Sequence, residues 1–243
     1  MPNIFDEIDR LQEEINKHRP LDKGLLKQVK EYYRIGLTYS SNALEGNSLT
    51  ETETKIVLEE GITIGGKPLK DHLEAIGHSQ AYDYLCDLAS KKTFEEQDIK
   101  KLHQFFYYRI DSENAGNYRE VRVYITGSKY PLPLPEAVPK LMKDLLAKLE
   151  KIRKKRHPVE FSALAHQELV FVHPFIDGNG RICRLLMNLI LLQEGYTPAV
   201  IFPVNRPEYI RTLEKAHQDS GDFINFIART VKETQKDYLR LFT

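Results

Sequence analysis

The residues His173–Arg184 read HPFIDGNGRICR and bring an imidazole, a carboxylate, two glycines and two guanidinium groups into one short stretch. Gly178 and Gly180 flank an asparagine at this point. Glycine lets the backbone approach a ligand and turn its N–H groups toward it, and the helix expected from Gly180 onward adds unpaired donors and the positive end of its dipole. The stretch therefore predicts an anion hole at the start of a helix.

The other polar groups of the stretch suit a polyphosphate ligand. Asp177 offers a hard oxygen for magnesium, which usually takes one or two carboxylates together with substrate phosphates. Arg181 and Arg184 are three residues apart, near one helix face, and guanidinium groups pair bidentately with phosphate oxygens. His173 can remove a proton from an attacking hydroxyl. Each residue alone is also typical of a cap, a turn or a solvated surface, and it is their combination that indicates phosphoryl-type transfer.

Outward from this stretch, the spacing of apolar residues predicts a largely helical chain. Thr50 and Glu53 have the spacing of a capping box, which indicates a helix start, and Glu45-Gly46-Asn47 breaks the helix before it. Apolar residues at three-four spacing predict the remaining helices. The expected helical segments are 25–40, one from 50 onward, 71–90, 95–109, 139–156, 160–172, 180–194, 207–217 and 223–239.

Residues 116–135 have a different pattern. Val121, Val123 and Ile125 alternate with other side chains, Gly127-Ser128 is a turn signal, and three prolines follow. This pattern predicts a short β-hairpin flap. The expected fold class is all-α with one small β element. We expect an N-terminal helical region at 1–90 and a catalytic core at 91–243.

Composition excludes several functional classes. Lysine plus arginine and aspartate plus glutamate number 35 each, so no basic field favours nucleic acid. The two cysteines, Cys86 and Cys183, lie far apart and predict no zinc site. The N-terminus lacks the apolar run of a signal peptide, and the most apolar stretch, 185–192, is too short to span a bilayer. We expect a cytoplasmic protein with neither a nucleic acid nor a membrane as partner.

The stretch His173–Arg184 resembles the signature of the Fic (filamentation induced by cAMP) domain family, H-x-F-x-[DE]-G-N-G-R-x-x-R, with every fixed position present. The resemblance extends to Gly116-Asn-Tyr-Arg119 and the flap, and covers the chain from about Tyr39 to its end. Fic proteins are helical bundles that mostly transfer AMP from ATP to a hydroxyl of a protein. The resemblance therefore implies an adenylyltransferase with ATP as substrate and Mg²⁺ as cofactor.

The resemblance also implies a role for each residue of the signature. His173 would be the general base and Asp177 the magnesium ligand. The α- and β-phosphates would bind the loop, and two arginines would orient the phosphate chain, with the second nearest the γ-phosphate. The residues implied to bind phosphate are Gly178, Asn179, Gly180, Arg181 and Arg184.

Two further sets of residues follow from the resemblance. The flap would align the target by strand-like pairing of backbone, in agreement with the alternation described above. Its central residues are Val123, Tyr124, Ile125, Thr126 and Gly127. Tyr209 and His217 fall where relatives contact the base, although relatives tend to have asparagine at the place of His217. Tyr209 could equally pack in the core.

Ser41-Asn42-Ala43-Leu44-Glu45-Gly46 resembles the inhibitory motif [ST]-x-x-x-E-[GN] of the same family. The implied subgroup carries its inhibitory helix N-terminal to the signature (class II). Its motif residues here are Ser41, Glu45 and Gly46. In such relatives the glutamate pairs with the last arginine of the signature, here Arg184, and displaces the γ-phosphate. The expected device is a two-state switch in which paired Glu45 is off.

Several alternatives stay open. Glu45 could position a water that removes AMP from the modified target, or the chain could transfer another nucleotide. A regulatory module that binds nucleotide without turnover belongs to a different class, and an intact His173 and Asp177 argue against it. The target is expected to be a protein with a serine, threonine or tyrosine hydroxyl, or the chain itself. A homodimer and a monomer both remain open. His103, His166 and Cys183 are expected to be structural.

Overall fold

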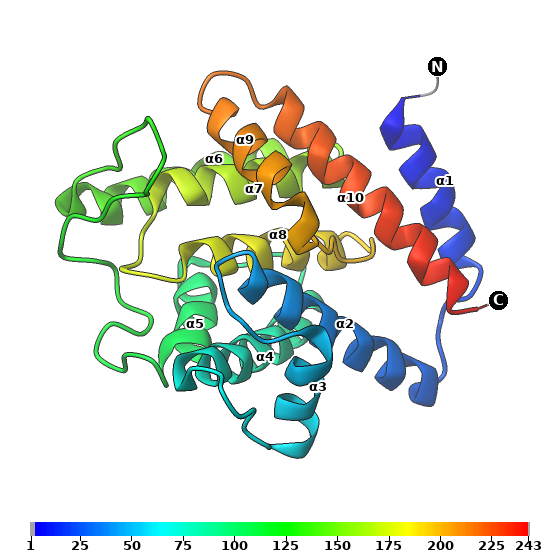
Figure 1. Ribbon diagram of the computed structural model, residues 1–243. Coiled ribbons are helices and arrows are strands. Elements are labelled where there is room, and N and C mark those ends of the chain that lie inside the picture. Colours follow the sequence, from blue (N-terminus) through cyan, green and yellow to red (C-terminus); the bar gives the residue numbers. More distant parts are fainter. Residues whose placement is uncertain (1–2, 243) are drawn as a thin grey trace.

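The computed structural model describes residues 3–242 and places ten α-helices and two short 3₁₀ turns in them (Figure 1). The helices are α1 (Ile4–Asn16), α2 (Lys23–Ala43), α3 (Glu51–Glu60), α4 (Leu69–Ala89), α5 (Glu96–Tyr107), α6 (Val138–Arg153), α7 (Pro158–Val172), α8 (Asn179–Gln193), α9 (Arg206–Lys215) and α10 (Gly221–Arg240). The 3₁₀ turns are η1 (Pro135–Ala137) and η2 (Pro203–Asn205). The all-α prediction is confirmed.

Helix α8 lies at the centre of the fold. Every residue from 181 to 190 is buried, because a helix that is apolar on most of its circumference must be covered on all sides. Helices α7, α4, α5 and α2 contact it, and Figure 1 shows α8 passing between these neighbours. The N-terminus of α8 carries the signature, so a buried central helix positions the predicted site.

The turn between α2 and α3 is built as its sequence indicates. Helix α2 ends at Ala43, and Gly46 adopts a φ of 93°, a left-handed conformation that costs glycine little. Thr50 accepts a hydrogen bond from the Glu53 N–H while the Glu53 carboxylate accepts one from the Thr50 N–H, which completes the predicted capping box. The turn therefore has a fixed shape, and it carries Glu45 toward α8.

Helix α1 was not among the predicted helices. It begins with an Asn3–Asp6 capping box and buries Ile8 and Ile15 completely. It packs along α10, and Lys232 of α10 pairs with Glu7, so the first and last helices lie side by side (Figure 1). Helix α1 depends on this distant partner, which the local pattern does not show.

The predicted β-hairpin flap is wrong as secondary structure. Residues 3–242 contain no strand, and residues 120–134 form an extended loop with a single turn, where the Ser128 N–H donates to the Ile125 carbonyl (3.2 Å). The side chain of Tyr124 is 85% exposed. An isolated two-stranded hairpin is marginal in water, and residues 3–242 contain no sheet that could extend its pairing. Alternation alone therefore overstated the order of this segment.

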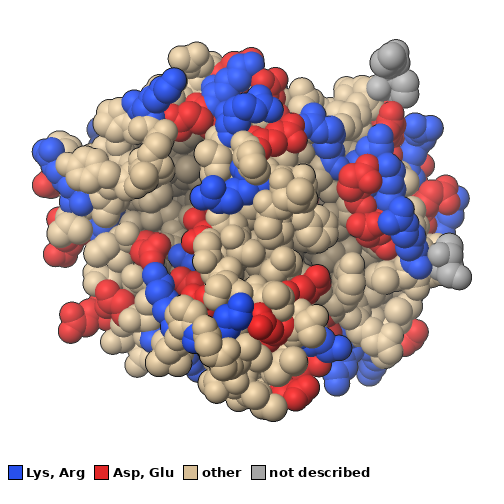
Figure 2. Space-filling view, viewed as in Figure 1, with Lys and Arg blue, Asp and Glu red and all other residues tan. Residues whose placement is uncertain are grey.

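Charge is spread evenly over the surface that Figure 2 shows, with acidic and basic side chains interspersed and no continuous field of one sign. This distribution agrees with the balanced composition. Among the described residues, no helix combines the length and the apolar character that crossing a bilayer would need.

Candidate active site

His173 ends α7 in a left-handed conformation, with φ 50° and ψ 60°. Among the described residues it is the only one other than glycine with a positive φ, a conformation that costs about 1–3 kcal/mol and is found most often at functional sites. Its Nδ1 lies 3.3 Å from the Val170 carbonyl, so in the neutral ring the proton is on Nδ1 and Nε2 is free to accept. Burial lowers the pKa of His173 to about 4, assisted by Arg119. The imidazole is thus a neutral base at physiological pH.

Arg119 fixes the backbone of this histidine. Its Nε donates to the His173 carbonyl (2.8 Å), and its own N–H donates to the Pro174 carbonyl (2.9 Å). The other guanidinium nitrogens donate to the carbonyls of Val121 (3.1 Å) and Pro133 (2.6 Å). One buried side chain therefore joins the base of the flap to the strained histidine. Sequence reasoning included Arg119 in the resemblance but assigned it no role.

His103 of α5 supports the loop that follows His173. Its Nδ1 accepts from the Gly116 N–H (2.9 Å), so Nε2 carries the proton and donates to the Asp177 carbonyl (3.1 Å). Its ring stacks on Phe175 with centroids 3.8 Å apart. Burial lowers the pKa of His103 to about 4, which keeps this neutral arrangement. The prediction of a structural histidine is confirmed, and its task is to hold the loop.

The signature loop is also held from within. The Asn179 side chain accepts from the Phe175 N–H (3.0 Å) and donates to the Phe175 carbonyl (2.8 Å). Gly178 has a φ of 78°, and a Cβ there would lie 2.7 Å from the Phe106 ring. Any other residue would therefore be strained and would collide with α5. The asparagine side chain is occupied by the loop, which leaves the backbone to face a ligand.

Asp177 and Arg181 form an ion-pair network at the mouth of the loop. Asp177 Oδ1 accepts from the Gly178 N–H (2.6 Å) and lies 3.3 Å from Arg181 Nη2, while Oδ2 lies 3.6 Å from Lys70 Nζ. Burial raises the pKa of Asp177, but Arg181, the Gly178 N–H and Lys70 outweigh it and lower the pKa overall. Arg181 also pairs with Glu74 of α4 (2.9 Å), and both side chains are buried. The carboxylate of Asp177 is therefore ionised.

Glu74 is a site residue that the sequence interpretation missed. Besides Arg181 it accepts from the side-chain amide of Asn47 (2.9 Å), which follows Gly46 in the turn after α2. The signal was available: a carboxylate between Leu73 and Ala75 lies in a largely buried helix, where charge needs a partner. A buried pair of this kind is strongly destabilised, by about 3–5 kcal/mol, when one partner is removed.

Arg184 is buried, at 4% exposure. Its Nε donates to the Ser41 hydroxyl (2.9 Å), and Nη2 donates to the Ser41 carbonyl and to Glu45 Oε1, at 2.8 Å each. Nη1 lies 3.3 Å from the Tyr209 hydroxyl, which is in turn 2.9 Å from His166 Nε2. Two residues of the inhibitory motif therefore bind the last arginine of the signature.

Glu45 approaches the first turn of α8 from outside. A Cβ on Gly180 would lie 2.3 Å from Glu45 Oε1, so the carboxylate reaches this position only because residue 180 is glycine. Burial raises the pKa of Glu45, but Arg184 and Arg181 outweigh it and hold the pKa below its ordinary value. An ionised carboxylate thus lies at a helix N-terminus between two arginines, a setting that suits a phosphate equally well.

Tyr209 and His217, which were both expected to contact the base of the nucleotide, lie in different environments. Tyr209 is 3% exposed and packs inside, against Phe223 and Phe226, with only its hydroxyl reaching Arg184. His217 follows the end of α9 and is exposed, with its ring stacked on Tyr130 of the flap. Tyr209 therefore packs in the core, which is the alternative that the sequence left open. Contact of Tyr209 or His217 with a nucleotide stays a prediction.

The described residues contain no cluster of three His, Cys, Asp or Glu side chains arranged around a common point. The signature loop, the α8 N-terminus, the two arginines and His173 instead form an open site, and the face shown in Figure 2 is hollowed left of centre, between the flap and the helices beside it. Fold and site together define an all-α protein in which a glycine-rich helix N-terminus and two buried arginines accompany a neutral histidine.

Comparison with known proteins identifies the family. The sequence profile of the Fic/DOC family matches residues 93–191. The structure of Fic-1 from C. elegans, residues 134–508, is 32% identical and superposes with a TM-score of 0.89, covering 98% of this chain and 72% of that one. A Fic-domain signalling protein from Bacteroides thetaiotaomicron is 29% identical with a TM-score of 0.84, over 95% of each chain. The chain belongs to the Fic/DOC family.

The curated relatives are longer proteins. The protein adenylyltransferase Fic of Nematostella vectensis is 35% identical over 242 residues, which cover 96% of this chain and 55% of the relative. The protein of the same name from Culex quinquefasciatus is 33% identical, and the match covers 47% of it. The chain thus spans about half the length of these relatives.

Proposed function

We propose that the chain is a protein adenylyltransferase that moves AMP from ATP to a serine, threonine or tyrosine hydroxyl of a target protein, and that Glu45 keeps its activity low. The observation that carries this proposal is the contact of Arg184 with Glu45 (2.8 Å) at the N-terminus of α8. It places a carboxylate where a nucleotide phosphate would bind, beside a neutral histidine. The names of the curated relatives support the same activity.

In the proposed reaction, His173 Nε2 takes the proton of the target hydroxyl as its oxygen attacks the α-phosphorus. The new bond joins that oxygen to the α-phosphorus, the bond from the α-phosphorus to the bridging oxygen breaks, and pyrophosphate leaves. His173 Nδ1 donates to the Val170 carbonyl, which orients the ring, and Arg119 donates to the His173 carbonyl, which holds the backbone ready for this step. A base of this kind typically contributes about 10²- to 10⁴-fold to the rate.

The phosphates would bind the loop and the first turn of α8. The backbone N–H groups near Gly178 and Gly180 and the positive end of the α8 dipole attract negative charge. Arg181, braced by Glu74 and by the Phe106 ring 4.5 Å from its guanidinium carbon, would bind the α- and β-phosphates. Arg184 would bind the γ-phosphate. Asn179 would act through the loop that it braces.

Asp177 fits a magnesium ion. It is ionised, its side chain is 42% exposed, and its Oδ2 has only Lys70 nearby, at 3.6 Å. Magnesium needs one or two carboxylates when phosphates complete its shell, and one carboxylate is what this site supplies. The ion would neutralise charge on the phosphates. Lys70, which is 57% exposed, can turn away to admit it.

The proposed inhibition is a competition for Arg184. With Glu45 in place, a γ-phosphate would meet a carboxylate instead of a free guanidinium, and two like charges in a partly buried site repel strongly. Ser41 and Tyr209 would still hold Arg184 after Glu45 leaves, so the arginine keeps its position in the active state. Release of Glu45 is therefore the proposed activating step.

For the base of the nucleotide, we propose that His217 contacts it with the edge of its ring. Tyr209 would contribute indirectly, by its hydrogen bond with Arg184. Both faces of the His217 ring are covered, by Tyr130 and Phe171 at centroid distances of 3.9 and 3.7 Å. Only its ring edge, with its nitrogen atoms, remains to meet a base. The backbone of residues 123–127 would align the target segment, and its exposure suits that role.

Wider features of the protein are also proposals. The target could be the chain itself, and the N-terminal region 1–90 would act as the regulatory part of a core at 91–243. A cytoplasmic setting and the choice between monomer and homodimer rest on sequence reasoning and on the family resemblance alone.

A lysate screen with labelled ATP tests the proposed function. The Glu45→Gly variant is expected to label itself or a lysate protein with AMP, and the double variant Glu45→Gly with His173→Ala is expected to label nothing. ATP labelled on the α-phosphate and on the γ-phosphate should be compared, because only the first transfers label in this reaction. Binding of ATP without transfer would favour a regulatory module, and the proposal would then be wrong.

A second candidate reaction is removal of AMP from a modified target. The observation that favours it is the position of the Glu45 carboxylate, which reaches Gly180 and raises the pKa of His173, so it lies near the proposed reaction centre. A carboxylate there could orient a water. Incubating pre-labelled protein with the wild type and with Glu45→Gln distinguishes the two: loss of label that needs Glu45 supports removal.

A further inference from the structure

The tip of the flap is bound to the C-terminal end of α9 by one carboxylate. Ser128 Oγ lies 3.0 and 3.2 Å from the two oxygens of Glu214, and the Lys129 N–H donates to Glu214 Oε1 (2.7 Å). The Ser128 hydroxyl oxygen also accepts from the Tyr130 N–H (3.2 Å). These residues lie 85 or 86 positions apart in sequence, so the contact is a long-range tie.

An aromatic stack strengthens the same tie. The His217 ring lies between Tyr130 of the flap and Phe171 of α7, with interplanar angles of 19° and 20°. The Gln218 amide donates to the Tyr130 hydroxyl (3.0 Å). Phe171 is two residues before His173. The tip of the flap is thereby connected to the helix that ends in the catalytic histidine.

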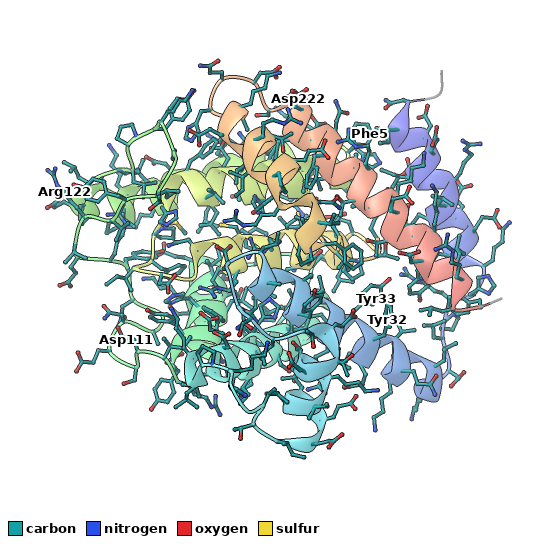
Figure 3. All side chains as sticks on the ribbon, viewed as in Figure 1. Phe5, Tyr32, Tyr33, Asp111, Arg122 and Asp222 are labelled. Carbon is teal, nitrogen blue, oxygen red and sulfur yellow. The ribbon has the colours of Figure 1, made fainter. Side chains whose placement is uncertain are left out.

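Between its two ends the flap lacks other support. Arg119 holds its base through the carbonyls of Val121 and Pro133, and Glu214 holds its tip. Residues between these ends are largely exposed, and Arg122 extends from the outer edge of the flap into solvent (Figure 3). Since no strand ladder fixes the segment, its position depends on these two attachments.

We propose that Glu214 is a positioning residue that latches the flap over the site and so sets the geometry in which a protein target is aligned. This inference rests on the proposed function for its effect on transfer. Hydrogen bonds to an ionised carboxylate are roughly twice as strong as neutral ones, so this contact dominates the attachment of the tip. Loss of the latch should slow AMP transfer to a protein, because alignment of the protein needs the flap. AMP transfer to water does not need the flap and should be unaffected.

Limited proteolysis tests the latch without reference to activity. Trypsin can cut after Arg122 and Lys129, which are both exposed. In Glu214→Ala, cleavage at these two bonds is expected to be about tenfold faster at an unchanged melting temperature, with Glu214→Gln between it and the wild type. Ser128→Ala removes the flap's hydroxyl from the same contact and should also make tryptic cleavage faster.

Glu208→Ala is the matched control, since this glutamate lies on the same helix and pairs with Arg229 (2.7 Å), away from the flap. It should be cleaved at the wild-type rate. Wild-type cleavage rates in both Glu214→Ala and Ser128→Ala would overturn the latch.

The second arm uses the Glu45→Gly background with labelled ATP. Adding Glu214→Ala is expected to lower AMP transfer to lysate proteins about tenfold, while AMP released to water stays the same. An equal fall in both would show damage to the nucleotide site and overturn the positioning role. If Glu45→Gly itself neither transfers nor releases AMP, the proposed function fails and the role in transfer fails with it, whereas proteolysis still decides whether the latch exists.

Discussion

The signature loop and the flap both contact the backbone around His173, yet the chain holds them in opposite ways. The loop is fixed from within, because Asn179 bonds both backbone groups of Phe175 and Gly178 alone fits beside Phe106. The flap has one internal turn, and it depends on the neighbouring Arg119 at its base and on Glu214, 85 positions away, at its tip. A rigid loop suits a ligand of fixed shape, and a latched loop suits targets of varied sequence.

Substitutions in the two regions should therefore have different effects on stability and activity. The loop combines a positive φ, a close approach to α5 and a strained histidine, so changes there affect folding and chemistry together. The exposed middle of the flap contacts little, so changes there should cost less stability than changes in the loop. The predictions below move from the loop to the flap and finally to the pH response of the histidine.

Replacing His173 with asparagine is expected to have the largest effect. Asparagine tolerates the left-handed conformation that His173 adopts, so the variant removes the base while keeping the backbone. In the Glu45→Gly background, AMP transfer should fall by about 10²- to 10⁴-fold with little change in melting temperature. Initial rates with labelled ATP measure the effect, and transfer within about twofold of the parent would exclude His173 as the base.

A pair of glycine substitutions compares the two loops by stability. Gly178→Ala places a Cβ 2.7 Å from the Phe106 ring at a φ of 78°, whereas Gly127→Ala meets nothing within 4 Å at a φ of 86°. Both lose the freedom of glycine at positive φ, at about 1 kcal/mol, and only the first adds a collision, at about 1–3 kcal/mol. Urea unfolding should show the larger loss for Gly178→Ala. Equal losses would mean that α5 does not constrain the loop.

The smallest expected effect is the response of the rate to mild acid. His173 acts as a base when neutral, and burial lowers its pKa to about 4, so it stays neutral as the pH falls from 8 to 6. Its protonation state should therefore change the transfer rate by less than about twofold over this range, with loss of activity centred near pH 4. A rate profile in the Glu45→Gly background measures this. An acid limb centred near pH 6.5 would indicate a solvated histidine instead.

The sequence predicted the parts of the site that are encoded locally. The helix start at Gly178, Asn179 and Gly180 is encoded within one turn, and the Thr50 capping box within three residues, so residue types and spacing sufficed to predict their local structure. Phosphate binding by Gly178, Asn179 and Gly180 stays a prediction. The pairing of Glu45 with Arg184 was predicted through the family resemblance, and it spans 139 positions. Spacing alone could not have predicted that contact.

What escaped prediction depends on tertiary contacts. Helix α1 needs α10 to cover Ile8 and Ile15, and Arg119 needs four carbonyls that the fold brings together. The flap was predicted as a hairpin because its alternation resembles a strand, but an alternating segment forms strands only when a partner accepts its backbone groups. The sequence indicated that Glu74, as a charge in a buried helix, needs a partner, but it did not identify Arg181 as that partner.

The most direct test of the account compares AMP transfer at one subsaturating ATP concentration, with magnesium in excess, for the wild type, Glu45→Gly and the control Glu51→Gly. Glu51 begins α3 and is exposed, so its loss leaves Arg184 paired. We expect Glu45→Gly to transfer AMP at least about tenfold faster than the wild type, equivalent to about 1.4 kcal/mol, and Glu51→Gly to match the wild type. Equal rates for all three would contradict the claim that Glu45 and a phosphate compete for Arg184.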